Sequence, residues 1–148
     1  MGKIKALILL AVIVATLVPQ MVKLGHCAVD MSIIATIESN NNPKAYNKSS
    51  GTVGMYQITP IVVKDFNKWL GASFTIDDMY NSSAAKIVAS WYLEVEIPRL
   101  LRYFHKETTT DNILWCYNAG IGNLVKGRKP AETRNYIKKY HKIERGTK

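Results

Sequence analysis

The chain has 148 residues, of which 47% are hydrophobic and 21% charged, and it carries a formal net charge of +9. This length leaves room for one compact domain and little else, because domains usually span roughly 100–200 residues. The positive charge favours an anionic polymer as partner, and nucleic acid, membrane headgroups and bacterial cell wall are the candidate classes.

The first residues predict a secretory signal. Lys3 and Lys5 supply positive charge, and an almost wholly apolar run from Ala6 to Val18 follows them. This run is shorter than the roughly 20 apolar residues of a transmembrane helix, so a cleaved signal over residues 1–28 is favoured over a membrane anchor. We expect an exported protein in the periplasm, the cell wall or the extracellular space. Export argues against a nucleic-acid partner, and no stable membrane span is expected after cleavage.

The two cysteines leave two interpretations open. Cleavage after Ala28 would remove Cys27 and leave Cys116 without a disulfide partner, whereas retention of Cys27 would allow a bridge between them. Cys116 lies within an apolar segment, residues 113–117. This setting favours a buried structural thiol over a nucleophile.

The first element of the mature chain is predicted to be a short amphipathic helix. Apolar residues from Val29 to Ile37 recur at three- and four-residue steps, which is the spacing of one helix face. Glu38 would then lie at the negative end of the helix dipole, where a carboxylate costs about 0.3–1 kcal/mol. We therefore expect a reason other than helix stability for this glutamate.

The rest of the chain predicts a small, mainly α domain. Residues 39–54 break all periodicity and are rich in Asn, Ser and Gly, and a loop of this length in a small domain is often functional. Helices are predicted over residues 55–70 with an interruption near Pro60, over 82–97 with an end or kink at Pro98, over 100–105 in a new direction, over 110–119 and over 130–142.

Glu38 also fits the chemistry of glycoside cleavage. This reaction needs a protonated carboxyl group and usually a second carboxylate about 5–9.5 Å away. No Asp or Glu follows Glu38 until Asp65. The pattern favours one carboxyl that acts first as acid and then as base. A distant carboxylate that approaches Glu38 in the fold stays an alternative.

Three blocks of residues resemble the signature of the soluble-transglycosylase (SLT) family of lytic transglycosylases. The first block comprises Glu38-Ser39, Asn42-Pro43, Ala45, Gly51, Gly54 and Gln57-Ile58-Thr59-Pro60. The second is Tyr117-Asn118-Ala119-Gly120, with Cys116 where the family usually has alanine, and the third comprises Pro130, Glu132-Thr133 and Tyr136. The blocks occur in the order typical of the family and cover nearly the whole mature chain.

The resemblance implies a goose-lysozyme-like, mainly α catalytic domain over residues 29–148. It implies cleavage of the β-1,4 bond between N-acetylmuramic acid and N-acetylglucosamine without water, which leaves a 1,6-anhydromuramic end. Glu38 resembles the single catalytic acid and base. Its pKa would have to be raised by an apolar cleft.

The resemblance also implies substrate-binding residues. Gln57 and Tyr117 resemble cleft residues at the cut bond, and Asn118 is expected to brace the same wall. Gly51 and Gly54 either let the loop pass close to the sugar or act as ordinary turn glycines.

Other side chains are assigned from their setting in the sequence. Ser39 either orients the acid or caps the helix locally. Tyr46 and Tyr56 are the predicted sugar platforms, because both lie in the loop. The three tryptophans, Trp69, Trp91 and Trp115, are predicted to be core residues, with stacking on sugar faces as the alternative. Glu132 is predicted to have a structural role near a helix N-terminus, with bracing of the active-site loop as the alternative.

No cofactor or metal is expected, since His105 and His141 lack metal-ligand spacing. Two other functions stay open: a muramidase that delivers water, and a cell-wall-binding accessory of a secretion, conjugation or phage apparatus. A monomer is expected, with peptidoglycan strands as its ligand.

Overall fold

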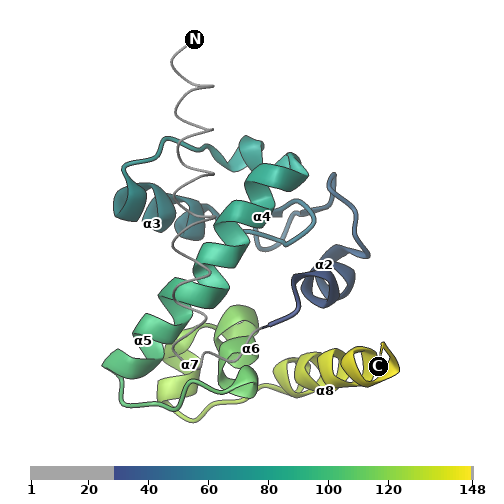
Figure 1. The fold of residues 1–148 in the computed structure, drawn as a ribbon, viewed down its shortest axis with the longest axis vertical. Helices are drawn as coiled ribbons and strands as arrows, with labels where there is room; N and C mark the ends of the chain where they lie inside the picture. Colours follow the sequence, from purple (N-terminus) through teal and green to yellow (C-terminus); the bar gives the residue numbers. More distant parts are fainter. Residues whose placement is uncertain (1–28, 148) are drawn as a thin grey trace.

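A rod of consecutive helical segments forms the centre of this computed structural model (Figure 1). The structure describes residues 29–147, so the predicted signal over 1–28, Cys27 and Lys148 lie outside the described residues. The elements in chain order are α2 (Met31–Ser39), β1 (Tyr46–Asn47), β2 (Thr52–Val53), α3 (Pro60–Leu70), the 3-10 helix η1 (Ile76–Tyr80), α4 (Ser82–Trp91), the π-helical turn η2 (Tyr92–Glu96), α5 (Ile97–Tyr103), α6 (Thr110–Ala119), α7 (Ile121–Val125) and α8 (Ala131–Gly146).

The rod joins α4, η2 and α5 without a break, so the predicted end or kink at Pro98 is wrong. The reason is the π-helical turn, in which the Ile97 N–H donates to the Tyr92 carbonyl five residues back. Pro98 then occupies the second position of α5, where a missing N–H is tolerated. The change of hydrogen-bond register lets the chain continue as one rod.

The other predicted helices are present with shifted ends. The first predicted helix is confirmed as α2. Asp30 caps its N-terminus, because the Asp30 carboxylate accepts a hydrogen bond from the Ser32 N–H at 2.8 Å. The helix predicted from residue 55 begins only at Pro60, where the Thr59 hydroxyl accepts from the Val62 N–H. The helix over 110–119 is confirmed as α6. The last helix ends four residues later than predicted, and α7 follows Gly120 unpredicted.

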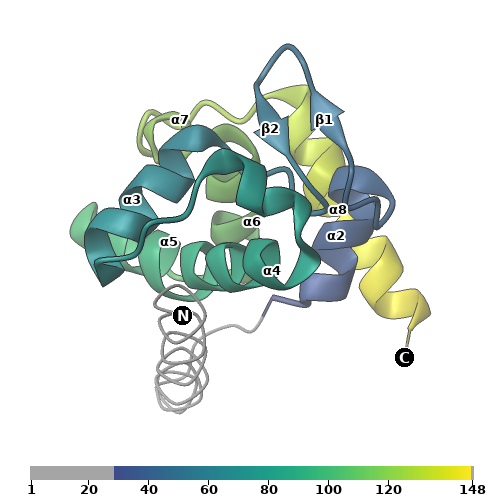
Figure 2. The same cartoon turned by 90° about the horizontal axis from the view of Figure 1, so that it is seen from above.

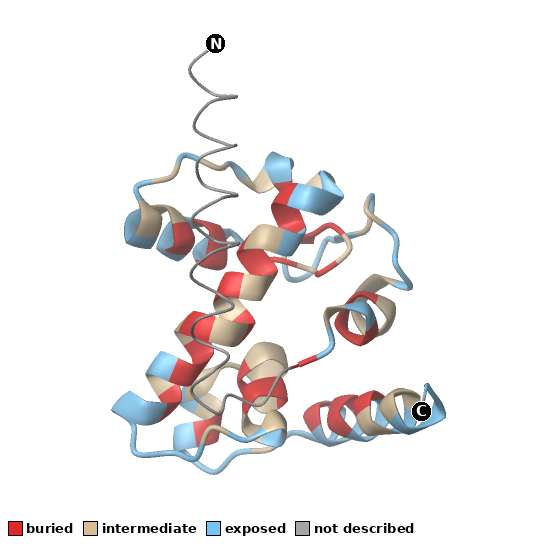
Figure 3. Cartoon of the chain, viewed as in Figure 1, coloured by how far each residue is buried: buried red, intermediate tan, exposed pale blue. Residues whose placement is uncertain are grey.

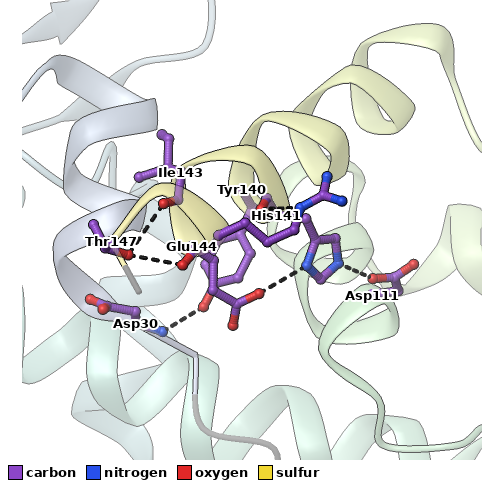
Figure 4. Close-up of polar contacts among 8 residues, drawn as sticks. Asp30, Asp111, Tyr140, His141, Ile143, Glu144 and Thr147 are labelled. Atoms are coloured by element: carbon purple, nitrogen blue, oxygen red, sulfur yellow. Dashed lines mark hydrogen bonds and ion pairs between the residues drawn. The ribbon is translucent and has the colours of Figure 1, made fainter.

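Contacts from the last helix hold the first one in place (Figure 4). The Asp30 N–H at the start of α2 donates to the hydroxyl of the fully buried Tyr140 at 2.7 Å. The neighbouring His141 joins α8 to α6, because its Nε2 lies 2.7 Å from Asp111 of α6. Its Nδ1 lies 3.1 Å from Glu144, one turn further along α8. Helix α8 therefore binds both α2 and α6.

The buried residues follow the rod and the inward sides of α2 and α8 (Figure 3). Cys116 is a free thiol that is buried, as predicted, and burial raises its pKa to about 12. Trp91 is a core residue as predicted, whereas Trp69 is 50% exposed and its assignment to the core is wrong. Trp115 is half-buried beneath the Lys129 ammonium, which lies 4.4 Å from the ring centre. Within residues 29–147, no helix combines the length and apolar character needed to cross a bilayer.

The loop after α2 forms a small hairpin on the same side of the molecule as α2 and α8 (Figure 2). Gly54 closes it with φ +79°, and a Cβ at this position would lie 2.1 Å from the Met79 carbonyl oxygen. Gly51 has φ +67° with open space around it. Neither glycine is among the residues that line the cleft described below, and Gly54 permits the close packing of η1. Whether the two glycines also let the loop pass close to a sugar stays a prediction.

Substitution of Gly51 and of Gly54 by alanine distinguishes the cost of a strained backbone conformation from the cost of a steric clash. Gly51→Ala should lower the free energy of unfolding by about 1 kcal/mol, because only the left-handed backbone conformation is penalised. Gly54→Ala should lower it by about 3 kcal/mol or more, because the hairpin must also move away from Met79. Urea titration of both variants measures the difference. Equal losses would contradict the proposed contact with Met79.

Candidate active site

A cleft of about 610 Å³ opens between the end of α2, the hairpin, the start of α3, and helices α6 and α8. Three of the predicted substrate-binding or bracing residues and the predicted acid lie in its wall. The complete lining comprises Ile37, Glu38, Asn47, Ser50, Thr52, Gln57, Ile58, Thr59, Ile61, Val62, Tyr92, Cys116, Tyr117, Asn118, Gly120, Glu132 and Tyr136.

Glu38 lies in the last turn of α2, half-buried in the cleft wall. Burial raises the pKa of its carboxyl group from the ordinary 4.5 to about 7. The hydrogen bond from Tyr136 and the charge of Lys139 oppose this increase in pKa, whereas the charge of Glu132 adds to it. The carboxyl group is thus partly protonated near neutral pH, as a group that first gives and then takes a proton requires.

Tyr136 on α8 is the direct partner of Glu38. Its hydroxyl donates to Glu38 Oε1 at 2.8 Å across 98 positions of sequence. Burial, and then the negative charge of Glu38, raise the pKa of Tyr136 well above its usual range, so the phenol remains a donor. The sequence places Tyr136 in the third motif but assigns it no role. The only signal for its role was its motif spacing.

The Tyr117 hydroxyl forms a hydrogen bond with a backbone carbonyl. It donates to the Tyr56 carbonyl at 2.6 Å, and burial followed by the charge of Glu38 raises its pKa. Tyr117 also packs against Tyr92 of the rod, with ring centroids 5.9 Å apart. The tyrosine therefore joins α6 to the loop and presents its ring in the cleft wall.

Gln57 is held by the hairpin in a left-handed backbone conformation, φ 49°. Its Oε1 accepts from the Thr52 hydroxyl at 2.7 Å, and its Nε2 donates to the Gly54 carbonyl at 2.9 Å. A primary amide has two N–H groups and two oxygen lone pairs. One donor and one acceptor of Gln57 therefore remain for a ligand.

Asn118 follows Tyr117 on α6 and lines the same cleft. The hydroxyl of Thr133, which is 1% exposed, donates to Asn118 Oδ1 at 2.7 Å and so joins α6 to α8. Ser39 acts on the loop, because its hydroxyl donates to the Met55 carbonyl at 2.8 Å and accepts from the Asn42 N–H at 3.1 Å. Ser39 thus joins the end of α2 to the loop around Met55, and a role in orienting the acid stays a prediction.

The two predicted sugar platforms lie in different settings. The Tyr56 side chain is 4% exposed and packs in the core, so its assignment as a stacking platform is wrong. A position in a loop does not fix whether a side chain points toward solvent, and the Tyr56 side chain points into the core. Tyr46 is 58% exposed on β1 but lies outside the cleft lining, and its role stays a prediction.

Glu132 is a second carboxylate in the cleft wall. It lies in the first turn of α8, one helical turn before Tyr136, and is exposed. No local sequence pattern links Glu132 to Glu38, because one lies on α8 and the other on α2. In the part of the chain that the structure describes, no three His, Cys, Asp or Glu side chains are grouped to hold a metal ion.

The raised pKa of Glu38 makes the stability of the fold depend on pH. The unfolded state loses the carboxyl proton near pH 4.5 and the folded state near pH 7, so the free energy of unfolding falls between these values as pH rises. Glu38→Gln should equal the wild type near pH 4 and exceed its stability by on the order of 2 kcal/mol near pH 8. Urea unfolding at both pH values measures this.

The exposed Glu107 offers a matched control, because Glu107→Gln removes a carboxylate outside the cleft. A stability gain of Glu38→Gln that is the same at both pH values would contradict the raised pKa.

Comparison with known proteins agrees with this site. The family model described as the transglycosylase SLT domain matches residues 26–140, which include Glu38 and the rest of the cleft. No curated protein and no solved structure matches the chain. The match confirms the mainly α, lysozyme-like SLT domain and places its action on cell-wall peptidoglycan, outside the cytoplasm. The chain therefore belongs to the transglycosylase SLT family, lytic transglycosylases that cleave glycosidic bonds of peptidoglycan.

Proposed function

We propose that this chain cuts the N-acetylmuramic acid–β-1,4–N-acetylglucosamine bond without water and that Glu38 is its single acid and base. The observation that carries this proposal is the half-buried Glu38 carboxyl, with a pKa of about 7, which opens into the cleft and accepts one hydrogen bond from Tyr136. A carboxyl with this pKa is populated in both protonation states at neutral pH.

In the first step Glu38 donates its proton to the glycosidic oxygen. The bond between that oxygen and the anomeric carbon breaks, its electron pair stays with the leaving sugar, and an oxocarbenium-like muramic residue remains. Tyr136 donates to the carboxylate that forms, 2.8 Å from Oε1, and so stabilises the charge that Glu38 acquires.

In the second step the Glu38 carboxylate takes the proton of the muramic 6-hydroxyl. The freed oxygen attacks the anomeric carbon of the same residue and closes the 1,6-anhydro ring. Glu38 is thereby protonated again, and no water is consumed. Gln57 has one amide donor and one acceptor left for an acetamido group. Tyr117 and Asn118 form the wall against which the sugar lies.

One observation favours a second candidate, a hydrolytic muramidase. Glu132 lines the same cleft as Glu38, and a water-delivering enzyme needs such a second carboxylate. The two reactions differ in product, because hydrolysis leaves a reducing muramic end and transglycosylation an anhydromuramic end.

The remaining parts of the proposal concern the setting of the enzyme. We take residues 1–28 as a cleaved signal and residues 29–148 as a monomeric domain that acts on glycan strands in the periplasm, the cell wall or the extracellular space. A secretion, conjugation or phage apparatus is the proposed partner class, since a small domain that opens local gaps in the wall suits such machines. A wall-binding accessory without catalysis would have no need of Glu38.

The products of wall digestion test the reaction. Residues 29–148 should release muropeptides with anhydromuramic ends from purified peptidoglycan, and Glu38→Gln should release none, as read by mass spectrometry. Reducing ends from the wild type would establish the muramidase instead, with Glu132→Gln as the next variant. Release of neither product by the wild type would overturn the catalytic proposal.

The pH dependence of the rate tests the role of Tyr136. The value of kcat/KM should fall as pH rises through the Glu38 pKa of about 7, because the acid loses its proton. Tyr136→Phe removes a hydrogen bond that stabilises the carboxylate, so the pKa of Glu38 should rise and the falling limb should move to higher pH.

Tyr140→Phe is the matched control, since the Tyr140 hydroxyl also joins α8 to α2 but accepts from the Asp30 N–H at the other end of α2 from Glu38. The falling limb of the kcat/KM profile of Tyr140→Phe should stay at the same pH as in the wild type. A Tyr136→Phe limb that stays in place or moves to lower pH would overturn the proposed role.

A further inference from the structure

Trp69 is the most exposed tryptophan of the described residues. It is 50% exposed near the end of α3, although its neighbour Phe66 is fully buried. The Trp69 ring is nevertheless held in place, because its centroid lies 6.0 Å from that of Trp91, which is only 2% exposed and packs on Phe66. The structure therefore presents a large aromatic side chain on a rigid support.

The support of Trp69 is continuous with the cleft wall. Trp91 precedes Tyr92, which lines the cleft, and their ring centroids are 6.3 Å apart. On α3 itself, Ile61 lines the cleft and is 64% exposed. Asp65 and Trp69 follow it at four-residue steps, and all three are exposed. Steps of four place the three side chains on one stripe of the helix.

This stripe leads away from the cleft over about 12 Å, from Ile61 to Trp69, at a rise of about 1.5 Å per residue. That length suits a disaccharide. A substrate that is a polymer has to continue beyond the reacting bond, and the stripe offers it the groups that sugars bind. An aromatic ring can pack against the C–H face of a sugar, and the Asp65 carboxylate can accept hydrogen bonds from hydroxyl or acetamido N–H groups.

We propose that Ile61, Asp65 and Trp69 extend the glycan-binding cleft along α3, with Trp69 as a stacking platform for a sugar ring beyond the site of cleavage. The proposal rests on the proposed function, because it starts from a glycan strand in the cleft. The rigid support matters here, since a side chain that is already ordered loses little conformational entropy on binding.

Oligomers of N-acetylglucosamine of two lengths test the extension. Glu38→Gln serves as the binding protein so that no bond is cut, and calorimetry gives Kd for a trimer and a hexamer. Addition of Trp69→Ala should weaken hexamer binding roughly five- to tenfold, the loss of one stacked ring, and leave trimer binding unchanged. Tryptophan fluorescence should change on hexamer addition in Glu38→Gln and change much less once Trp69 is replaced.

Tyr103→Ala in the same background is the matched control. Tyr103 is a 71% exposed aromatic residue, and it ends α5 at the end of the rod remote from α3 (Figure 1). This variant should bind both oligomers as Glu38→Gln does. Trp69→Phe, which keeps an aromatic ring, should restore most of the hexamer affinity, as a purely structural defect would not predict.

Three results would overturn the proposal. Equal hexamer affinity with and without Trp69 would remove the platform. Equal weakening of trimer and hexamer would assign Trp69 to the packing of the cleft wall. Failure of Glu38→Gln to bind either oligomer would overturn the extension together with the proposed glycan cleft, whereas loss of length dependence alone leaves the proposed reaction at Glu38 intact.

Discussion

The hydrogen bond from Tyr136 to Glu38 is the contact on which the rest of the site depends. It requires α8 to lie across α2, and the fold supplies this packing through the buried Tyr140 hydroxyl at Asp30 and through His141 at Asp111. The same packing removes Glu38 from water, which is the main reason that its pKa is raised. One arrangement of helices therefore buries the acid and provides its donor.

The π-helical turn of the central rod contacts the part of the cleft wall that Tyr117 of α6 forms. It continues the helix through Pro98 and places Tyr92 against Tyr117, so the rod reaches the cleft at its middle. Tyr117 in turn holds the loop through the Tyr56 carbonyl, and the hairpin of that loop holds Gln57. The cleft wall is thus a chain of contacts that runs from the rod to the hairpin.

The sequence alone predicts the helices and the acid better than it predicts the surroundings of the acid. Glu38 is recognisable because a carboxylate at a helix C-terminus needs a reason, and the motif supplies one. The partnership with Tyr136 joins residues 98 positions apart, and no local pattern encodes it. The position of Glu132 in the same cleft as Glu38 is not predicted for the same reason. Tyr56 and Trp69 show a different limit: neighbours in a loop or on a helix face look alike in sequence, yet one ring is buried and the other is half exposed. Pro98 shows a third, since the rule that proline ends a helix assumes the α-helical hydrogen-bond register.

The long separation between Glu38 and its donor also bears on the order of synthesis. A chain made from its N-terminus contains the acid early, but it lacks Tyr136 and Glu132 until α8 has been added. A nascent chain without α8 lacks the Tyr136 hydroxyl that donates to Glu38 Oε1 in the folded protein. The pairing of Glu38 with its hydrogen-bond donor is therefore complete only once α8 has been made and has packed on α2.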